Sequence, residues 1–173
     1  MEVCELLEVD RDSLFALLRQ SVVQEIAQAL SVPPEQIEPA PGLTYSRPMN
    51  NWRGKTGTVK MEIVEFRAPE CYEVRILSVD GTTTITYLLE EAEGDFDKDA
   101  AEHVAPIPVT RVTYREEYEG SSRSLNLNRK IMQPFFKRGA KRRIVRRLHE
   151  MERYVKSFPR AEENIEDHVK EVS

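Results

Sequence analysis

The hydrophobic and polar positions along the chain predict a strand, a helix, a group of strands and a long final helix. Apolar side chains alternate in residues 2–9, which indicates a short strand. Over residues 12–30 they follow helical spacing, which indicates one helix, or two helices with a bend near Gln20. Pro33 and Pro34 end this helix, because proline disfavours helical backbone in the residue before it.

Five further strands are predicted after this helix, and they cover residues 43–46, 58–66, 72–78, 82–89 and 107–117. Alternation of apolar and polar side chains in them is typical of a sheet with one buried face and one wet face. Turn signals at 68–70 and 80–81 predict consecutive antiparallel hairpins. An acidic segment, residues 90–106, interrupts the series, and we expect a mobile loop there because it contains little to bury.

The final helix combines an apolar stripe with a large excess of positive charge. The stripe residues share one face because they are spaced four apart. They are Phe136, Ala140, Ile144 and Leu148. Residues 123–147 contain ten basic side chains and no acidic one. Pro134 indicates either that the main helix starts there or that an earlier turn is kinked at that point.

Length and composition fit one α+β domain. A chain of 173 residues with 40% hydrophobic content can form a core of its own, and such a chain buries about 70% of its unfolded surface. We expect the domain to cover residues 1–155 and residues 156–173 to form a polar tail.

The expected compartment is the cytoplasm. No apolar run is long enough to span a bilayer, and the N-terminal MEVCELLEVD carries acids where a secretion signal carries bases. Cys4 and Cys71 lie far apart in sequence, so we expect buried free thiols instead of a disulfide or a metal site.

The order of the elements and five sequence segments resemble a known superfamily. The segments are MEVCELLEV, LFALLRQSVVQEI, ITYLLE, VTYREEYEG and FFKRGAKRRIVRRLHEMERY. The chain is similar to the START/SRPBCC-type superfamily, which includes the birch-pollen-allergen-like proteins. More narrowly, it resembles a family of small uncharacterised proteins from Gram-positive bacteria. This resemblance covers about residues 1–155.

The resemblance implies a helix-grip fold, in which a curved antiparallel sheet wraps around a long C-terminal helix. It also implies a cavity between the sheet and this helix for apolar or amphiphilic ligands, lipids included. The candidate lining residues are Trp52, Tyr72, Arg75, Tyr87, Tyr114, Phe136, Ala140 and Ile144. The alternative interpretation is that these aromatic residues are ordinary members of the core and surface.

The sequence contains no arrangement of residues that predicts catalysis. His103, His149 and His168 stand apart from one another and from any metal-ligand spacing, so surface histidines are expected. The segment 50–57 ends like a phosphate loop, but its glycine spacing is wrong and it leads into a strand. We therefore expect no catalytic residue, no metal and no cofactor.

The strongest surface feature is the basic side of the final helix. It consists of Lys137, Lys141, Arg142, Arg143, Arg146 and Arg147, and we call it the basic surface. Nucleic acid is not the expected partner, because the charged face has no interleaved aromatics and the whole chain carries a net charge of −5. A solvated face is favoured, partly paired with Glu116, Glu117, Glu150 and Glu152.

Three functions follow from these observations. The favoured one is binding of a small apolar or amphiphilic ligand without chemistry of its own. The alternative is an interaction module that docks a partner protein through the sheet or the basic surface. An enzyme of the cyclase or hydrolase kind ranks last, because the sequence places no acid or base.

Overall fold

The computed structural model describes residues 1–50, 56–93, 107–121 and 123–157, with only the backbone described for Asn50 and residues 123–137. Trp52, His103 and His168, most of the acidic loop and the polar tail therefore lie outside the described residues. The elements are β1 (Glu2–Leu7), α1 (Arg11–Leu30), a short 3-10 helix η1 (Pro34–Gln36), β2 (Thr44–Asn50), β3 (Thr56–Arg67), β4 (Cys71–Ser78), β5 (Gly81–Ala92), β6 (Val109–Gly120) and α2 (Arg123–Ser157).

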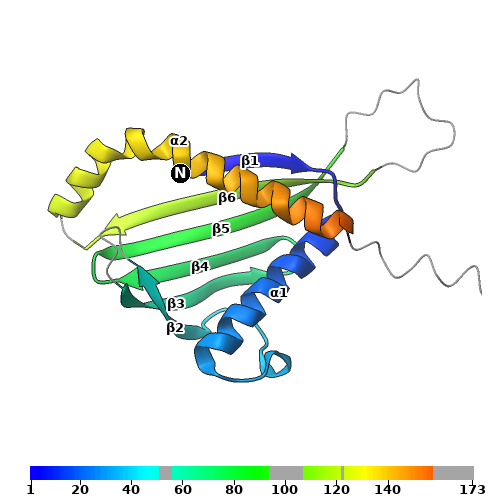
Figure 1. The fold of residues 1–173 in the computed structure, drawn as a ribbon, viewed down its shortest axis with the longest axis horizontal. Helices are drawn as coiled ribbons and strands as arrows, with labels where there is room; N and C mark the ends of the chain where they lie inside the picture. Colours follow the sequence, from blue (N-terminus) through cyan, green and yellow to red (C-terminus); the bar gives the residue numbers. More distant parts are fainter. Residues whose placement is uncertain (51–55, 94–106, 122, 158–173) are drawn as a thin grey trace, which may run out of the picture.

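Six antiparallel strands form one curved sheet in the order β1-β6-β5-β4-β3-β2, and both long helices lie across the same face of it (Figure 1). Strands β2 to β6 follow one another as hairpins, and β1 closes the sheet by pairing with β6, from Glu2 opposite Arg115 to Leu7 opposite Thr110. This arrangement confirms the predicted α+β fold with an antiparallel sheet around a long C-terminal helix. It is the helix-grip fold.

Several strands are longer than the sequence pattern predicts, and β5 and β2 are the informative cases. β5 continues to Ala92, so Glu90 and Glu91 pair with β6 and do not belong to a loop. β2 continues through Pro48, which an edge strand tolerates because one side of its backbone needs no partner. The predicted strands end too early at these places because the hydrophobic alternation stops there, whereas the backbone pairing continues through polar residues.

α1 is a single unbroken helix, so the alternative of two helices with a bend is wrong. The Asp10 carboxylate caps its start by accepting a hydrogen bond from the Ser13 amide at 2.9 Å. The helix ends at Leu30, and Ser31 caps it with a left-handed backbone at φ 56°. Its buried stripe, which packs on the sheet, consists of Leu14, Phe15, Leu18, Val22, Ile26 and Ala27.

α2 begins at Arg123 and continues to Ser157, so it does not start at Pro134. Figure 1 shows that it bends in its first half, the part that contains Pro134. A proline inside a helix bends it because the ring removes one hydrogen bond and clashes with the preceding turn. Beyond the bend, Leu148 is 1% exposed in the core, and Ile144, Met151 and Val155 pack against it.

The two faces of the sheet differ as the alternation predicts. The inner face, which the helices cover, carries the buried residues, among them Val74 and Val112. The outer face carries polar side chains and Cys4, which is exposed. The prediction of two buried thiols is therefore wrong for Cys4 and right for Cys71. Burial raises the pKa of Cys71 to about 11.

Among the helices described, none has the length and apolar character needed to cross a membrane.

Candidate functional site

A row of aromatic side chains crosses the inner face of the sheet from β3 to β6. The strand register places Phe66 opposite Tyr72, Tyr72 opposite Tyr87, and Tyr87 opposite Tyr114. Their ring centroids are 5.8, 6.3 and 5.1 Å apart in that order. Phe15 of α1 extends the row, with its centroid 5.3 Å from that of Phe66. Directly opposed residues of antiparallel strands point to the same face, so the register itself builds this row.

The tyrosine hydroxyls in the row remain neutral at ordinary pH. Burial is the main cause that raises the pKa of Tyr72, Tyr87 and Tyr114. The charge of Glu116 raises the pKa of Tyr87 and Tyr114 further, and Arg147 opposes this effect. The Tyr114 hydroxyl donates to Glu116 Oε2 at 3.3 Å. The row therefore combines flat apolar rings with neutral hydroxyl groups, and within it Tyr72 and Tyr114 are buried in the core whereas Tyr87 is half-buried.

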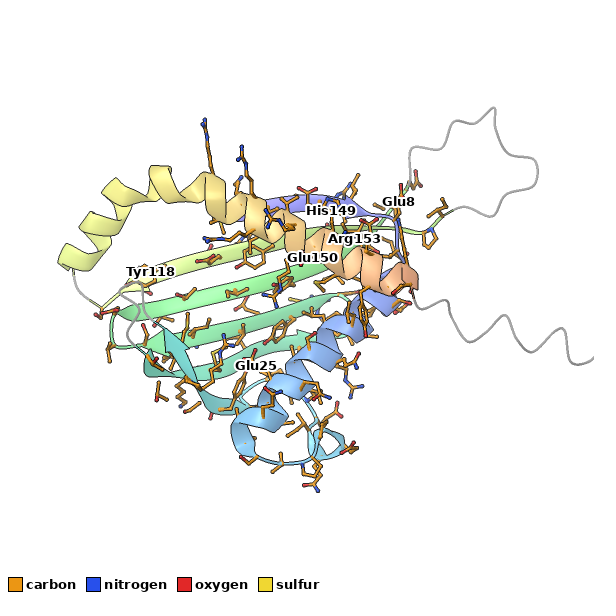
Figure 2. All side chains as sticks on the ribbon, viewed as in Figure 1. Glu8, Glu25, Tyr118, His149, Glu150 and Arg153 are labelled. Carbon is orange, nitrogen blue, oxygen red and sulfur yellow. The ribbon has the colours of Figure 1, made fainter. Side chains whose placement is uncertain are left out.

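A second polar group lies beside the row, between α1 and β2. The Tyr45 hydroxyl donates to Glu25 Oε1 at 2.8 Å, and Arg47 Nη1 lies 3.3 Å from Glu25 Oε2. Figure 2 labels Glu25 where α1 crosses the sheet. Tyr45 is 3% exposed, and burial followed by the bond to Glu25 raises its pKa. Tyr45 and Tyr72 lie close enough to influence each other's pKa, so this group adjoins the aromatic row.

The predicted lining residues are only partly brought together. Tyr72, Tyr87 and Tyr114 form the row, and Ala140 and Ile144 of α2 are half-buried. Arg75 and Tyr72 lie on opposite faces of β4, with Arg75 on the outer face. Its Nη1 pairs there with Glu62 Oε2 at 3.3 Å, so Arg75 is not part of the site. Trp52 and the side chain of Phe136 lie outside the described residues.

Sequence reasoning missed the polar residues of the site. Tyr45 and Arg47 alternate with outward residues on β2, and the same pattern could have placed them on the inner face. Glu25 adjoins the apolar stripe of α1, three positions after Val22. Nothing in the sequence indicates that Glu25 and Tyr45 meet, because that contact depends on how α1 crosses the sheet.

The basic surface is open to solvent. Lys141, Arg142, Arg143 and Arg146 are exposed, and they form no ion pair with any described residue. The side chain of Lys137 lies outside the described part. The pairing predicted with Glu117, Glu150 and Glu152 is therefore not found among these residues. Arg147 differs from its neighbours, since its charge acts on Tyr87 and Tyr114 at the sheet.

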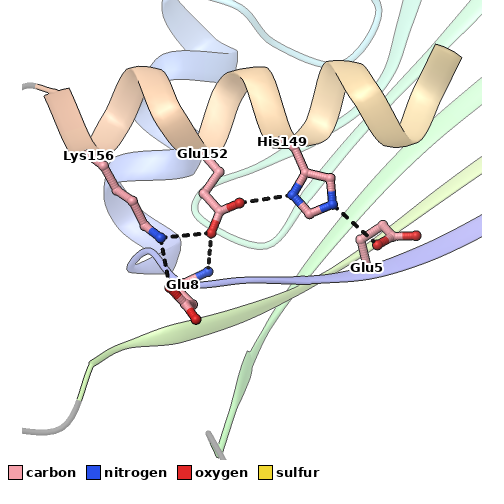
Figure 3. Close-up of polar contacts among 5 residues, drawn as sticks. All are labelled: Glu5, Glu8, His149, Glu152 and Lys156. Atoms are coloured by element: carbon pink, nitrogen blue, oxygen red, sulfur yellow. Dashed lines mark hydrogen bonds and ion pairs between the residues drawn. The ribbon is translucent and has the colours of Figure 1, made fainter. Parts of the chain in front are cut away.

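The Glu152 carboxylate instead joins the end of α2 to β1 (Figure 3). Its Oε2 lies 2.9 Å from His149 Nδ1, and its Oε1 accepts from the Glu8 amide at 2.9 Å and from Lys156 Nζ at 3.0 Å. Lys156 also contacts Glu8 Oε2 at 2.8 Å, and His149 Nε2 lies 3.6 Å from Glu5 Oε2. We call these five residues the β1–α2 latch.

Burial alone would raise the pKa of Glu152. The bonds from His149, Glu8 and Lys156 outweigh it and lower the pKa to about 2. His149 was expected to be a surface histidine, and its side chain is 45% exposed within the latch.

A separate hollow of about 340 Å³ lies where the end of β3, the turn after it and β5 meet the start of α1. Its lining residues are Arg11, Arg67, Glu70, Leu88, Leu89, Glu90 and Glu91. None of the four aromatic residues of the row lines it, and an ion pair at 3.0 Å joins Arg11 to Glu91 within it. Among the residues described, no cluster of three or more His, Cys, Asp or Glu side chains could hold a metal ion.

Residues 1–137 match the family model of the domain of unknown function DUF3284. The chain belongs to this family. DUF3284 is uncharacterised, as the sequence resemblance to small uncharacterised proteins implies. No curated protein matches the chain.

Several solved structures have a similar fold at low sequence identity. A protein from Arthrobacter aurescens has a TM-score of 0.52 at 15% identity, covering 92% of this chain and 87% of its own. A protein of unknown function from Staphylococcus aureus has a TM-score of 0.50 at 12% identity, covering 90% and 91%. The crystal structure of Ara h 8.0201 has a TM-score of 0.45 at 14% identity, covering 91% of this chain and 97% of its own.

Proposed function

We propose that this DUF3284 protein binds a small apolar or amphiphilic molecule on the inner face of the sheet, beside α2. The observation that carries the proposal is the aromatic row, with ring centroids 5.1 to 6.3 Å apart over four strands. Membership of the wider START/SRPBCC-type superfamily is part of the same proposal, since the resemblance to it implies a ligand in this place.

The row has the composition of a site for a flat or elongated apolar molecule. Small-molecule sites in proteins are mostly apolar and carry a few placed polar groups that fix orientation. Tyr87 and the neighbouring Ile85 supply apolar surface that the core only partly covers. Tyrosine hydroxyls next to that surface suit the polar end of an amphiphile.

The test uses N-phenylnaphthylamine, a neutral probe that fluoresces when it leaves water. The unmodified protein should give a saturable increase with about one probe per chain. I85K places a charge on the inner face beside the row and should weaken binding at least about tenfold, because a buried unpaired charge opposes an apolar ligand.

The matched control is T86K, which places the same charge on the outer face, one residue along β5, and should leave binding within about twofold. Circular dichroism checks that both variants fold. No saturable binding by the unmodified protein, or equal loss in both folded variants, would contradict the proposal.

A second candidate function is docking of an anionic partner protein through the basic surface. It is favoured by Arg142, Arg143 and Arg146, which are exposed and form no ion pair with described residues. Replacing all three by Glu should abolish capture of that partner in a pull-down without changing the melting temperature. Unchanged capture would rule this candidate out.

A further inference from the structure

The side of α2 that faces away from the sheet carries a long band of positive charge. The described members of the basic surface are exposed, and the exposed Arg138 and Arg153 extend this surface along the helix. Arg138, Arg142 and Arg146 follow one another at four-residue intervals, so they lie in one line. The helix rises about 22 Å from Arg138 to Arg153. Figure 2 shows nitrogen-ended side chains that project from this part of α2 away from the sheet.

Acidic residues of the same chain do not balance this band. None of its cations forms an ion pair with a described residue. The carboxylates that approach α2 from β1, together with Glu152, are already held in the β1–α2 latch. Among the described residues between Arg138 and Arg153, the one exposed acid is Glu150. The band therefore keeps a positive excess that attracts an anionic partner from outside.

The band has no apolar centre. Protein interfaces gain most of their binding energy from buried aromatic and apolar anchors inside a polar rim. Among the described side chains of α2, Tyr154 is the one exposed large hydrophobic residue, and it lies at the end of the band, next to Arg153. The apolar stripe with Leu148 packs on the sheet. A lipid surface needs no such centre, because each cation near anionic head groups adds about fivefold to the affinity.

The spacing of the charges favours an array of phosphate groups over a single anion. One phosphate is held by donors that converge on it, whereas successive cations of the line are about 6 Å apart along the helix. Each arginine can bind a phosphate of its own through two parallel hydrogen bonds. Duplex nucleic acid also presents phosphates, but it concentrates more negative charge against a chain whose net charge is −5.

We propose that α2 docks the protein on the surface of a bilayer that contains anionic phospholipids. The basic surface, Arg138 and Arg153 lie against the phosphate head groups, while the apolar stripe stays packed on the sheet. The inference goes beyond the proposed function, because it needs no ligand on the inner face. It assigns the basic surface to lipid instead of to the anionic protein of the second candidate function.

The test mixes the full chain with vesicles and separates bound from free protein by sedimentation. One kind of vesicle contains phosphatidylcholine alone, and the other contains equal parts of phosphatidylcholine and phosphatidylglycerol. Binding to the anionic vesicles should be at least about tenfold stronger at low salt. Physiological salt should weaken it at least about threefold, because mobile ions screen exposed charges at separations beyond about 8 Å.

A double variant assigns the binding to the band. R142Q combined with R146Q removes two charges from its middle and should weaken binding to anionic vesicles at least about tenfold. The matched control combines K60Q with R111Q, which removes the same total charge from exposed positions on the outer face of the sheet. This control should bind within about twofold of the unmodified protein. Circular dichroism checks that both double variants fold.

A third variant tests the same surface by a gain of binding. Glu150 is the exposed acid within the band, so E150Q should strengthen binding to anionic vesicles at least about threefold. E90Q removes an acid from an exposed position on the outer face and should leave the binding unchanged. A general loss of stability does not explain a gain that only E150Q shows.

The outcomes separate the inference from the other proposals. Equal binding to the two kinds of vesicle, equal loss in the two double variants, or tighter binding of a DNA duplex than of anionic vesicles overturns the inference. Capture of an anionic protein through the basic surface without any vesicle binding also overturns it and leaves the second candidate function in place. Ligand binding on the inner face is independent of all these results.

Discussion

At the scale of single residues, Glu152 shows how one carboxylate joins distant parts of the chain. Its side chain is only 12% exposed and bonds with the Glu8 amide of the β1 end and with His149 and Lys156 of α2. These bonds favour the charged form strongly enough to lower its pKa to about 2 despite burial. Proton uptake by Glu152 is therefore coupled to unfolding.

The sign of this coupling predicts a loss of stability in acid. The pKa of Glu152 is about 2 in the folded protein, against 4.5 for the free carboxyl group. Its contribution is therefore present above about pH 4.5 and is lost as the pH falls from there towards 2. E152Q should lower the free energy of unfolding by about 2 kcal/mol at pH 7, and by less than half of that at pH 3, as measured by urea denaturation.

The control variant is E150Q, which removes the same charge from an exposed position two residues earlier in α2. It should change the stability by no more than about 0.5 kcal/mol at either pH. An equal loss in the two variants would show that the effect comes from the net charge of the helix and not from the β1–α2 latch.

The arrangement of the latch residues could be predicted from the sequence only in small part. The lack of any metal-ligand spacing predicted a surface position for His149, but no pattern indicated that Glu5, Glu8 and Glu152 surround it. Glu8 and Glu152 are 144 residues apart in sequence, and only the packing of α2 across β1 brings them together. Such contacts leave no local periodicity in the sequence, so the sequence pattern does not predict them.

At the scale of elements, α2 is held to the sheet by a narrow apolar stripe on an otherwise charged helix. Leu148 is 1% exposed, whereas Ile144 and Met151 on the same stripe are only partly buried. Leu148 therefore contributes more burial than its neighbours to the attachment of this helix.

Leu148→Ala should lower the free energy of unfolding by about 2–5 kcal/mol, because it removes buried methyl groups and leaves a cavity. Arg146→Ala, two residues earlier and exposed, should change it by less than about 0.5 kcal/mol. Chemical denaturation with matched m-values measures both. A small effect of Leu148→Ala would mean that the stripe does not hold α2 on the sheet.

Element patterns were predicted well where side-chain periodicity and backbone structure agree. The strands alternate because one face is buried, and that alternation is visible in the sequence. The start of α2 could not be fixed in the same way, since Pro134 is compatible with a new helix or with a bend.

At the scale of the whole molecule, we propose that the folding domain ends within α2 and that the remaining residues form a tail. Among the described residues the buried core runs from Val3 to Leu148 and includes residues of both helices and the six strands, and partly buried Val155 packs against it. Lys156 also bonds to Glu8 and Glu152, so a chain ending after Ser157 keeps the latch complete.

A chain shortened to residues 1–157 should have the same midpoint of urea denaturation as the full chain, within about 0.3 M. A chain shortened to residues 1–147 loses Leu148 and the latch, and it should unfold at a clearly lower urea concentration. Equal destabilisation by the two truncations would contradict the proposed boundary.

The candidate site was predictable only where it depends on register. Tyr72, Tyr87 and Tyr114 could be placed on one face from strand alternation, and adjacency of the hairpins then makes them neighbours. Arg75 lies on the opposite face from Tyr72, as strand alternation along β4 itself indicates. The grouping of Glu25 with Tyr45 and Arg47 depends on the crossing of α1 over β2, which no local pattern specifies.

The pairing of β1 with β6 has a consequence for synthesis on the ribosome. Glu2 and Arg115 form an ion pair at 3.0 Å across 113 residues of chain. The first strand therefore emerges long before its partner exists, and its hydrogen-bonding edge waits unpaired during most of translation. Chaperones that shield such edges would be most useful to this protein early in elongation, before the sixth strand has been made.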